Sequence, residues 1–290
     1  MASGIFALLD DIATLMDDVA STTKVATEKT VGILADDLAV NAEKASGFLA
    51  SRELPVLWKL TKGSFLNKVI ILPAVFLLSA FFPVAITPIL LLGGTYLSFE
   101  GALKVHHYIF KKKKSKVSLK KTEMTGEELV AYEAKKIKSA IFVDFILSIE
   151  IIILALGSVI EEPLGMQISA VTIVALLATV GVYGIVALLV RMDDVGYRLI
   201  SIGKSSFLVG TGNFLVKSLP IIIRVLNVVG TIAMFLVGGG IFVHNLHFIH
   251  ELTMGFPSIL GELFIGLVAG IIFLLIYLGF SSLLNMVREK

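Results

Sequence analysis

Long apolar stretches are the feature that most constrains this chain. Four of them occupy residues 139–160, 168–190, 225–249 and 259–287, and a fifth covers residues 69–99. At a rise of about 1.5 Å per residue, roughly 20 apolar residues cross a hydrocarbon core of about 30 Å. A hydrophobic fraction of 56% is also well above that of a soluble domain. The sequence therefore predicts an all-α, polytopic membrane protein.

The basic residues are distributed so that all of them can lie on one side of the membrane. If residues 69–99 cross twice, the 25 lysines and arginines fall in segments that share a side: 1–68, 102–138, 191–224 and the last few residues. The connections 161–167 and 250–258 carry none. Because basic residues accumulate in cytoplasmic loops, this pattern predicts that both termini are cytoplasmic.

Three prolines divide the fifth stretch. Residues 69–99 contain Pro73, Pro83 and Pro88 and no charge. As one helix they would be about 46 Å long, which is too long for one crossing without heavy tilt. A turn near Pro83 is predicted, because proline removes a backbone donor and restricts the residue before it. Within residues 64–102 the two halves are either nearly full crossings or a re-entrant hairpin, and the sequence leaves both open.

The other segments complete the predicted architecture. Residues 1–63 have helical patterns interrupted by carboxylates, which predicts an amphipathic cap at the cytoplasmic surface. Residues 103–138 form a basic loop in which Lys111–Lys114 either contact anionic lipid headgroups or act as a solvated topology signal. Residues 139–290 are predicted to hold four full spans, with an interfacial segment at 195–223.

Short strings recur in the same order along the chain and suggest a weak, parallel internal duplication. The matches pair residues 30–33 with 179–182, 36–38 with 193–195, 46–49 with 205–208, and 91–94 with 236–239. In the last pair, the glycines are expected where backbones approach closely or helices break.

Ionisable side chains inside the predicted spans are the strongest candidates for function, because each costs at least about 2.5 kcal/mol at the centre of a membrane. Glu150 lies 12 residues after Lys138, or about 18 Å into its span. Asp144 points about 120° away from Glu150 on the same helix, so the two need separate partners. We predict a polar cavity for transport, or alternatively an interhelical hydrogen bond that fixes packing. The predicted cavity residues are Glu150, Asp144, Glu100 and Asn227.

Three histidines follow one another at helical spacing near the end of a span. His244, His247 and His250 are neighbours on a continuous helix. Such a set could contribute ligands to Zn²⁺, with another ligand from elsewhere. The alternative is a polar helix end at the membrane interface.

Four acidic pairs lie in segments assigned to the cytoplasmic side. They could together bind a divalent cation through oxygen ligands, or serve only in helix capping and local ion pairs. The pairs are Asp10 with Asp11, Asp17 with Asp18, Asp36 with Asp37, and Asp193 with Asp194.

Motifs of soluble enzymes are absent from the sequence. It contains no Gly-x-Ser-x-Gly, no His-Glu-x-x-His and no phosphate-binding glycine loop, and it has no cysteine. We therefore expect no enzyme activity, no cofactor and no nucleic-acid partner. Gly266 and Gly270 match a small-xxx-small motif, which ordinary helix packing explains.

Several strings together resemble the YedI-like bacterial inner-membrane family. They include Phe6-Ala7-Leu8-Leu9-Asp10-Asp11, Arg52-Glu53-Leu54-Pro55-Val56, Ala85-Ile86-Thr87-Pro88, Asp144-Phe145-Ile146-Leu147-Ser148 and Met234-Phe235-Leu236-Val237-Gly238-Gly239-Gly240. The resemblance covers nearly the whole chain and implies a multi-pass protein of the bacterial inner membrane. That family is a domain of unknown function, so it implies no active-site residue.

The sequence leaves three functional hypotheses. The first is a small-solute or ion transporter or channel that uses Glu150. The second is a non-transporting scaffold that binds lipid or partner proteins, and the third is an intramembrane metal-dependent enzyme that uses the histidines. The lipid bilayer is a partner in all three, and a homo-oligomer is compatible with each.

Overall fold

The residues that the structure describes form helices joined by short turns, and none of them forms a strand. The computed structural model describes residues 2–45, 50–110, 126–202 and 205–288. The side chains of residues 2–11, 50–52, 126–131, 193 and 282–288 are also outside the description. The elements are α1 (Ala2–Ala45), α2 (Ala50–Phe81), a short 3-10 helix η1 (Pro83–Ala85), α3 (Ile86–Phe110), α4 (Gly126–Gly157), α5 (Leu164–Ile202), α6 (Ser206–Asn245), α7 (His247–Thr253) and α8 (Ser258–Arg288).

Six helices in the described residues are long and apolar enough to cross a membrane, judged by length and composition. These segments of α2, α3, α4, α5, α6 and α8 confirm the predicted all-α membrane bundle. The proline-rich stretch forms the predicted turn: α2 ends at Phe81, and α3 begins at Ile86. Because both helices are long enough to span by themselves, the re-entrant alternative finds no support.

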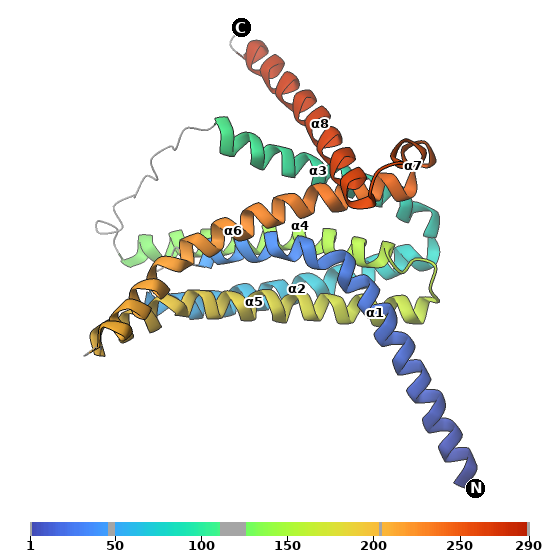
Figure 1. Cartoon of the computed structure of the whole chain (residues 1–290), viewed down its shortest axis with the longest axis horizontal. Helices are drawn as coiled ribbons and strands as arrows, with labels where there is room; N and C mark the ends of the chain where they lie inside the picture. Colours follow the sequence, from blue (N-terminus) through green and yellow to red (C-terminus); the bar gives the residue numbers. More distant parts are fainter. Residues whose placement is uncertain (1, 46–49, 111–125, 203–204, 289–290) are drawn as a thin grey trace.

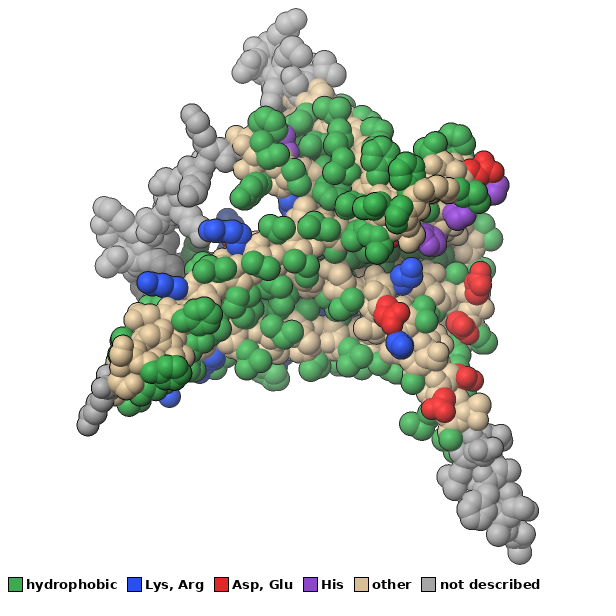
Figure 2. Space-filling model, viewed as in Figure 1, with side chains coloured by type: hydrophobic (Ala, Val, Ile, Leu, Met, Phe, Trp, Pro, Cys, Tyr) green, Lys and Arg blue, Asp and Glu red, His purple; other side chains and the backbone are tan. Residues whose placement is uncertain are grey.

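The helices form two layers (Figure 1). The long helices α2, α4 and α5 lie nearly parallel with the second half of α1, while α6 leans across α1 and α5. On its other side α6 packs against α3 and α8. Figure 2 shows hydrophobic side chains over most of the visible face, as expected for a surface in contact with lipid.

The N-terminal segment differs from the predicted surface cap of short helices. α1 is one 44-residue helix, and its second half lies between α4, α5 and α6. Lys29 borders a cavity with Ser158 and His244 at one end of the bundle, whereas Ala42 packs near Ala140 towards the other end. The helix therefore runs through the bundle rather than beneath it. The first half leaves the bundle at an angle (Figure 1).

Residues 195–223 are the adjoining ends of two long helices rather than a separate interfacial segment. α5 continues to Ile202 and α6 begins after the Ser205 cap, whose side chain accepts from the backbone N–H of Phe207. The helices approach closely where a Cβ on Gly196 or on Gly212 would collide with the other's backbone.

The proposed duplication remains a prediction, although the helix directions agree with it. α1 and α5 run in the same direction along the bundle, and so do α2 and α6, which follow them (Figure 1). The two glycine clusters also lie where backbones approach closely, because a Cβ on Gly94 would meet the carbonyl of Gly238 at 3.1 Å.

Candidate functional site

The second half of α1 carries polar side chains into the centre of the bundle. Asp36 is fully buried, and Asp37 and Asn41 are 6% and 1% exposed. A glycine allows this burial, since a Cβ at Gly230 of α6 would collide with the Asp36 backbone. Buried carboxylates are costly unless they are paired and hydrogen-bonded, so the contacts of these residues define the candidate site.

The first group of contacts, here called the Asp144 network, consists of Asp37, Asn41, Asn67, Lys68, Asp144 and Tyr183. Asp144 Oδ1 accepts a hydrogen bond from the Tyr183 hydroxyl at 2.8 Å, and Oδ2 accepts one from Asn67 Nδ2 at 2.9 Å. The Tyr183 hydroxyl also lies 3.3 Å from Asn41 Oδ1, and Asn41 Nδ2 donates to Asp37 Oδ1 at 2.5 Å. One tyrosine and one asparagine thus link the carboxylates of α1 and α4.

Lys68 supplies the positive charge of the Asp144 network. It is 5% exposed, and its Nζ donates to the hydroxyls of Ser64 and Ser148, each at 3.0 Å. Ser148 follows Asp144 by one helical turn, so the ammonium faces the same side of α4 as that carboxylate. The negative charges of Asp144 and Asp37 both act on Lys68. The network therefore combines the Lys68 cation with two buried carboxyl groups, and the buried Nζ of Lys44 adds a second positive charge that acts on both.

The second group, here called the Lys104 cluster, consists of Asp36, Glu100 and Lys104. Lys104 Nζ lies 2.6 Å from Asp36 Oδ1 and 3.3 Å from Glu100 Oε1. It also lies 3.7 Å from the sulfur of Met234. Within the described residues, neither Asp36 oxygen has an aligned hydrogen-bond donor, so the contact with Lys104 is an ion pair. The cluster joins α1 to α3.

Glu150 is a further buried carboxyl group of the core, and the charges of Glu100, Asp36 and Lys104 act on it. It is 8% exposed, and neither of its carboxyl oxygens has a hydrogen-bond partner in the part of the chain that the structure describes. It borders a groove of about 260 Å³ between α3 and α4. Most buried polar groups in native proteins are hydrogen-bonded, so this exception requires an explanation.

α1 connects the two groups, because Asp36 and Asp37 are consecutive and point about 100° apart. Together with Glu150, the Asp144 network and the Lys104 cluster contain five carboxyl groups and two ammonium groups. Lys44 adds a third ammonium group near Asp37 and Asp144, so the five carboxyl groups outnumber the ammonium groups by two.

The structure places three of the four predicted cavity residues in this region. Asp144 belongs to the Asp144 network, Glu100 belongs to the Lys104 cluster, and Glu150 borders the groove beside α3. Asn227 is half-buried on α6, where its backbone carbonyl accepts from the Thr231 hydroxyl at 2.7 Å.

The three histidines do not share one helix. α6 ends at Asn245, Leu246 is extended, and α7 begins at His247. His244 Nδ1 lies 2.8 Å from the Gly240 carbonyl oxygen, while His247 pairs with Glu251 at 3.2 Å. Across the described segments, no group of three or more His, Cys, Asp or Glu side chains is arranged to hold a metal ion.

The acidic pairs are not brought together. Asp17 and Asp18 are exposed on the free half of α1, whereas Asp36 and Asp37 are in the core. Asp194 forms a local pair with Arg191 at 2.8 Å, which was the alternative considered for that pair. The side chains of Asp10, Asp11 and Asp193 lie outside the described residues, as do Lys111–Lys114.

Several residues of the site are not recognisable from the sequence. Lys68 precedes an apolar run, and Lys104 falls in the predicted basic loop, so both lysines have the positions of topology signals. Tyr183 lies in an apolar span without a charged neighbour. One signal in the sequence points to Lys68. Ser64 and Lys68 are four residues apart, as are Asp144 and Ser148, so each pair shares a helix face and can form a polar contact between helices.

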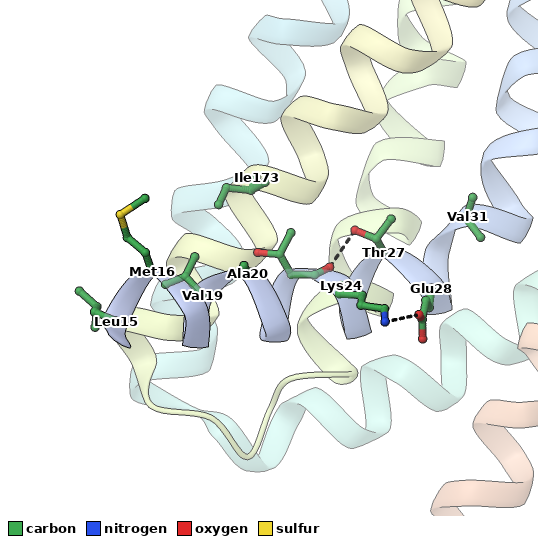
Figure 3. Close-up of a pocket in the computed structure, with 10 residues that line it drawn as sticks. Leu15, Met16, Val19, Ala20, Lys24, Thr27, Glu28, Val31 and Ile173 are labelled. Atoms are coloured by element: carbon green, nitrogen blue, oxygen red, sulfur yellow. Dashed lines mark hydrogen bonds and ion pairs between the residues drawn. The ribbon is translucent and has the colours of Figure 1, made fainter. Parts of the chain in front are cut away.

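A larger cavity lies elsewhere (Figure 3). It measures about 750 Å³ and follows the outer side of α1, where Leu15, Met16 and Val19 project into it and Ile173 of α5 borders it. Its charged groups are Lys24 and Glu28, which pair on the surface at 3.8 Å. This is the open angle between the departing half of α1 and the bundle, and it does not reach the buried carboxylates.

Comparison with known proteins assigns a family but no activity. A family model described as a protein of unknown function (DUF808) matches residues 3–278. The chain therefore belongs to that family, whereas the YedI-like name is not confirmed. No curated protein and no solved structure matches the chain.

Proposed function

We propose that this member of the DUF808 family is a membrane transport protein, rather than an enzyme, and that it conducts protons or small cations along α1. The observation that supports the proposal is the row of buried carboxyl and ammonium groups contributed by α1, α2, α3 and α4. Ionisable residues in membrane-embedded helices are costly and commonly mark ion or proton pathways.

The position of α1 gives the proposed path an entrance at one end of the bundle. A cavity of about 470 Å³ borders Glu28, Lys29, His244 and Glu262 where α1 enters the bundle. Asp36 follows Lys29 by seven residues, or about 10 Å along the helix. From there the Asp144 network continues through Asp37. Asn41 and Tyr183 bridge Asp37 to Asp144, so the carboxyl groups of α1 and α4 belong to one connected set of hydrogen bonds.

A structural role is the second candidate function, and the Asp144 network gives it a specific basis. Its carboxylate, amide, hydroxyl and ammonium groups are hydrogen-bonded to one another or to the serines. Such a network can fix the packing of helices without moving any ion. The hydrogen bonds of the Asp144 network are compatible with transport and with a structural role. A flux measurement distinguishes the two functions.

We expect Asp144→Asn to lower proton or cation flux at least about tenfold, because one carboxyl site on the path is lost. The measurement uses purified protein in liposomes with an internal pH dye and an imposed K⁺ diffusion potential. Glu161→Gln is the matched control, since Glu161 is exposed in the turn between α4 and α5. Equal flux in wild-type, Asp144→Asn and protein-free liposomes would favour the structural role.

The path of α1 also leads us to propose that its first half lies on the side of the membrane opposite to the lysine-rich loop. This differs from the sequence-based prediction of a cytoplasmic N-terminus. Lys29 and Ser158 line the same cavity. Ser158 comes just before the connection 161–167, which carries no lysine or arginine and lies at the end of α4 opposite to the lysine-rich loop. The bacterial inner membrane remains our proposed location, on the basis of the sequence resemblance.

Single cysteines test this topology, because the chain has none of its own. In right-side-out vesicles we expect an impermeant maleimide to label Ala20→Cys without permeabilisation. Ser115→Cys in the lysine-rich loop should be labelled only after the membrane is opened. Labelling of both positions from the same side would contradict the arrangement.

A further inference from the structure

A groove between α3 and α4 opens from the lipid-facing surface to the buried Glu150. Its volume is about 260 Å³. Leu92 and Tyr96 at its edge are 69% and 44% exposed, whereas Leu97 and Leu154 at its base are buried. Apart from Glu150 and Tyr96, its walls are formed by leucine, isoleucine and glycine. The groove is therefore an apolar slot with a carboxyl group at its inner end.

The groove is unfilled along α3. A Cβ built on Gly93, one of the lining residues, would have no atom within 4 Å. This contrasts with Gly94 on the next position, whose Cβ would meet Gly238 and Ile241 of α6. α3 thus uses one glycine for close packing, while the neighbouring glycine leaves space beside Glu150.

Glu150 gives the groove its specificity. The carboxyl is more than nine-tenths buried, and within the described residues neither oxygen has a hydrogen-bonding partner. The charges of Glu100, Asp36 and Lys104 all act on Glu150, so acidic neighbours outnumber basic ones. A ligand with an ammonium group would supply the missing N–H donor and add a positive charge. A charge-assisted hydrogen bond contributes about 1.5–3 kcal/mol, which corresponds to roughly tenfold or more in affinity.

The depth of the groove limits what can occupy it. Glu150 lies seven residues before the end of α4 at Gly157, or about 10 Å below that end. A lipid headgroup remains at the interface, so the polar group of the ligand must itself enter the hydrocarbon region. The volume is also below the usual range for drug-sized ligands, roughly 300–1,000 Å³.

We propose that the α3–α4 groove binds a small lipophilic amine, whose alkyl chain lies along the apolar walls and whose ammonium group donates to Glu150. The ligand reaches the site laterally, from the lipid. This site does not depend on the proposed transport, because binding requires no ion flux and no residue of the Asp144 network.

The apolar reagent N,N′-dicyclohexylcarbodiimide tests access to Glu150 from the lipid. The acid oxygen adds to the carbodiimide carbon while its proton passes to nitrogen, and an O-to-N acyl shift then gives a stable N-acylurea with no group lost. In the full-length protein in liposomes, we expect mass spectrometry to find this adduct on Glu150. Octylamine should slow the labelling at least about tenfold. Octanol, which has the chain but no ammonium group, should protect much less.

Two variants separate the groove from the carboxyl. Glu150→Gln should abolish the adduct at this position. Gly93→Leu should fill the groove and strongly reduce both labelling and octylamine protection, while the carboxyl remains. Gly181→Leu is the matched control, because a Cβ on this glycine of α5 also meets nothing within 4 Å. Thermal unfolding checks that each variant is folded.

Three results would overturn the inference. They are an unlabelled Glu150 in the folded wild-type protein, equal labelling in Gly93→Leu and Gly181→Leu, and protection by octanol as strong as by octylamine. The last result would show that the groove takes an alkyl chain without an ammonium contact.

Discussion

Lys68→Met is expected to lower the free energy of unfolding by about 3 kcal/mol or more, because it removes the cation beside two buried carboxyl groups. Lys68 is 5% exposed, and its ammonium group is hydrogen-bonded by Ser64 and Ser148. Methionine keeps much of the volume but leaves Lys44 as the remaining cation whose charge acts on Asp37 and Asp144. Unfolding in detergent micelles, followed by circular dichroism with increasing denaturant, measures the loss.

Lys62→Met is the matched control on the same helix. Lys62 is exposed and lies 5.3 Å from the centre of the Trp58 ring. An exposed cation–π contact contributes only about 0.5–1 kcal/mol. The double variant Lys68→Met with Asp144→Asn should regain part of the stability, since it removes one unbalanced charge. If Lys68→Met were as stable as Lys62→Met, the Asp144 network would not hold the helices together.

The membrane-spanning helices were predictable because contact with lipid requires each of them, by itself, to have an apolar sequence. A helix that faces lipid must be apolar along about 20 residues, and α2, α3, α4, α5, α6 and α8 satisfy this condition in the sequence. The turn near Pro83 was predictable because proline acts locally on the backbone.

α1 could not be predicted by the same rule. Asp36 and Asp37 appeared to exclude this segment from the bilayer, because the rule assumes that a helix is exposed to lipid. In the structure the neighbouring helices surround the second half of α1, and Lys104 and Asn41 partner its carboxylates. Hydropathy predicts which helices contact lipid. The second half of α1 contacts other helices instead, so its low hydropathy does not exclude it from the bundle.

The candidate site was predictable only in part, for a similar reason. Glu150 and Asp144 were noticeable because they interrupt an apolar run, but their partners depend on which helices are neighbours. Lys68 and Lys104 lie at the ends of apolar runs, where a lysine ordinarily meets water. The histidine prediction assumed one continuous helix, and the extended Leu246 interrupts it.

Gly266→Ala is expected to destabilise the bundle by about 1–3 kcal/mol through a single added methyl group. Its Cβ would collide with the carbonyl oxygen of Phe235 in α6, and backbone atoms cannot move aside without shifting the helix. One turn later, a Cβ on Gly270 would collide with the Ser98 carbonyl of α3. The small-xxx-small motif thus lets α8 contact two helix backbones, an arrangement common in membrane bundles.

Gly279→Ala on the same helix should stabilise the bundle rather than destabilise it. A Cβ at Gly279 meets no atom within 4 Å, and alanine favours a helix over glycine by about 1 kcal/mol. Thermal unfolding in the same detergent compares the variants, and a disulfide between cysteines placed in α6 and α8 reports whether the helices separate. Equal melting temperatures for Gly266→Ala and Gly279→Ala would mean that α8 does not make this close contact, because intrinsic helix preference alone treats the two glycines alike.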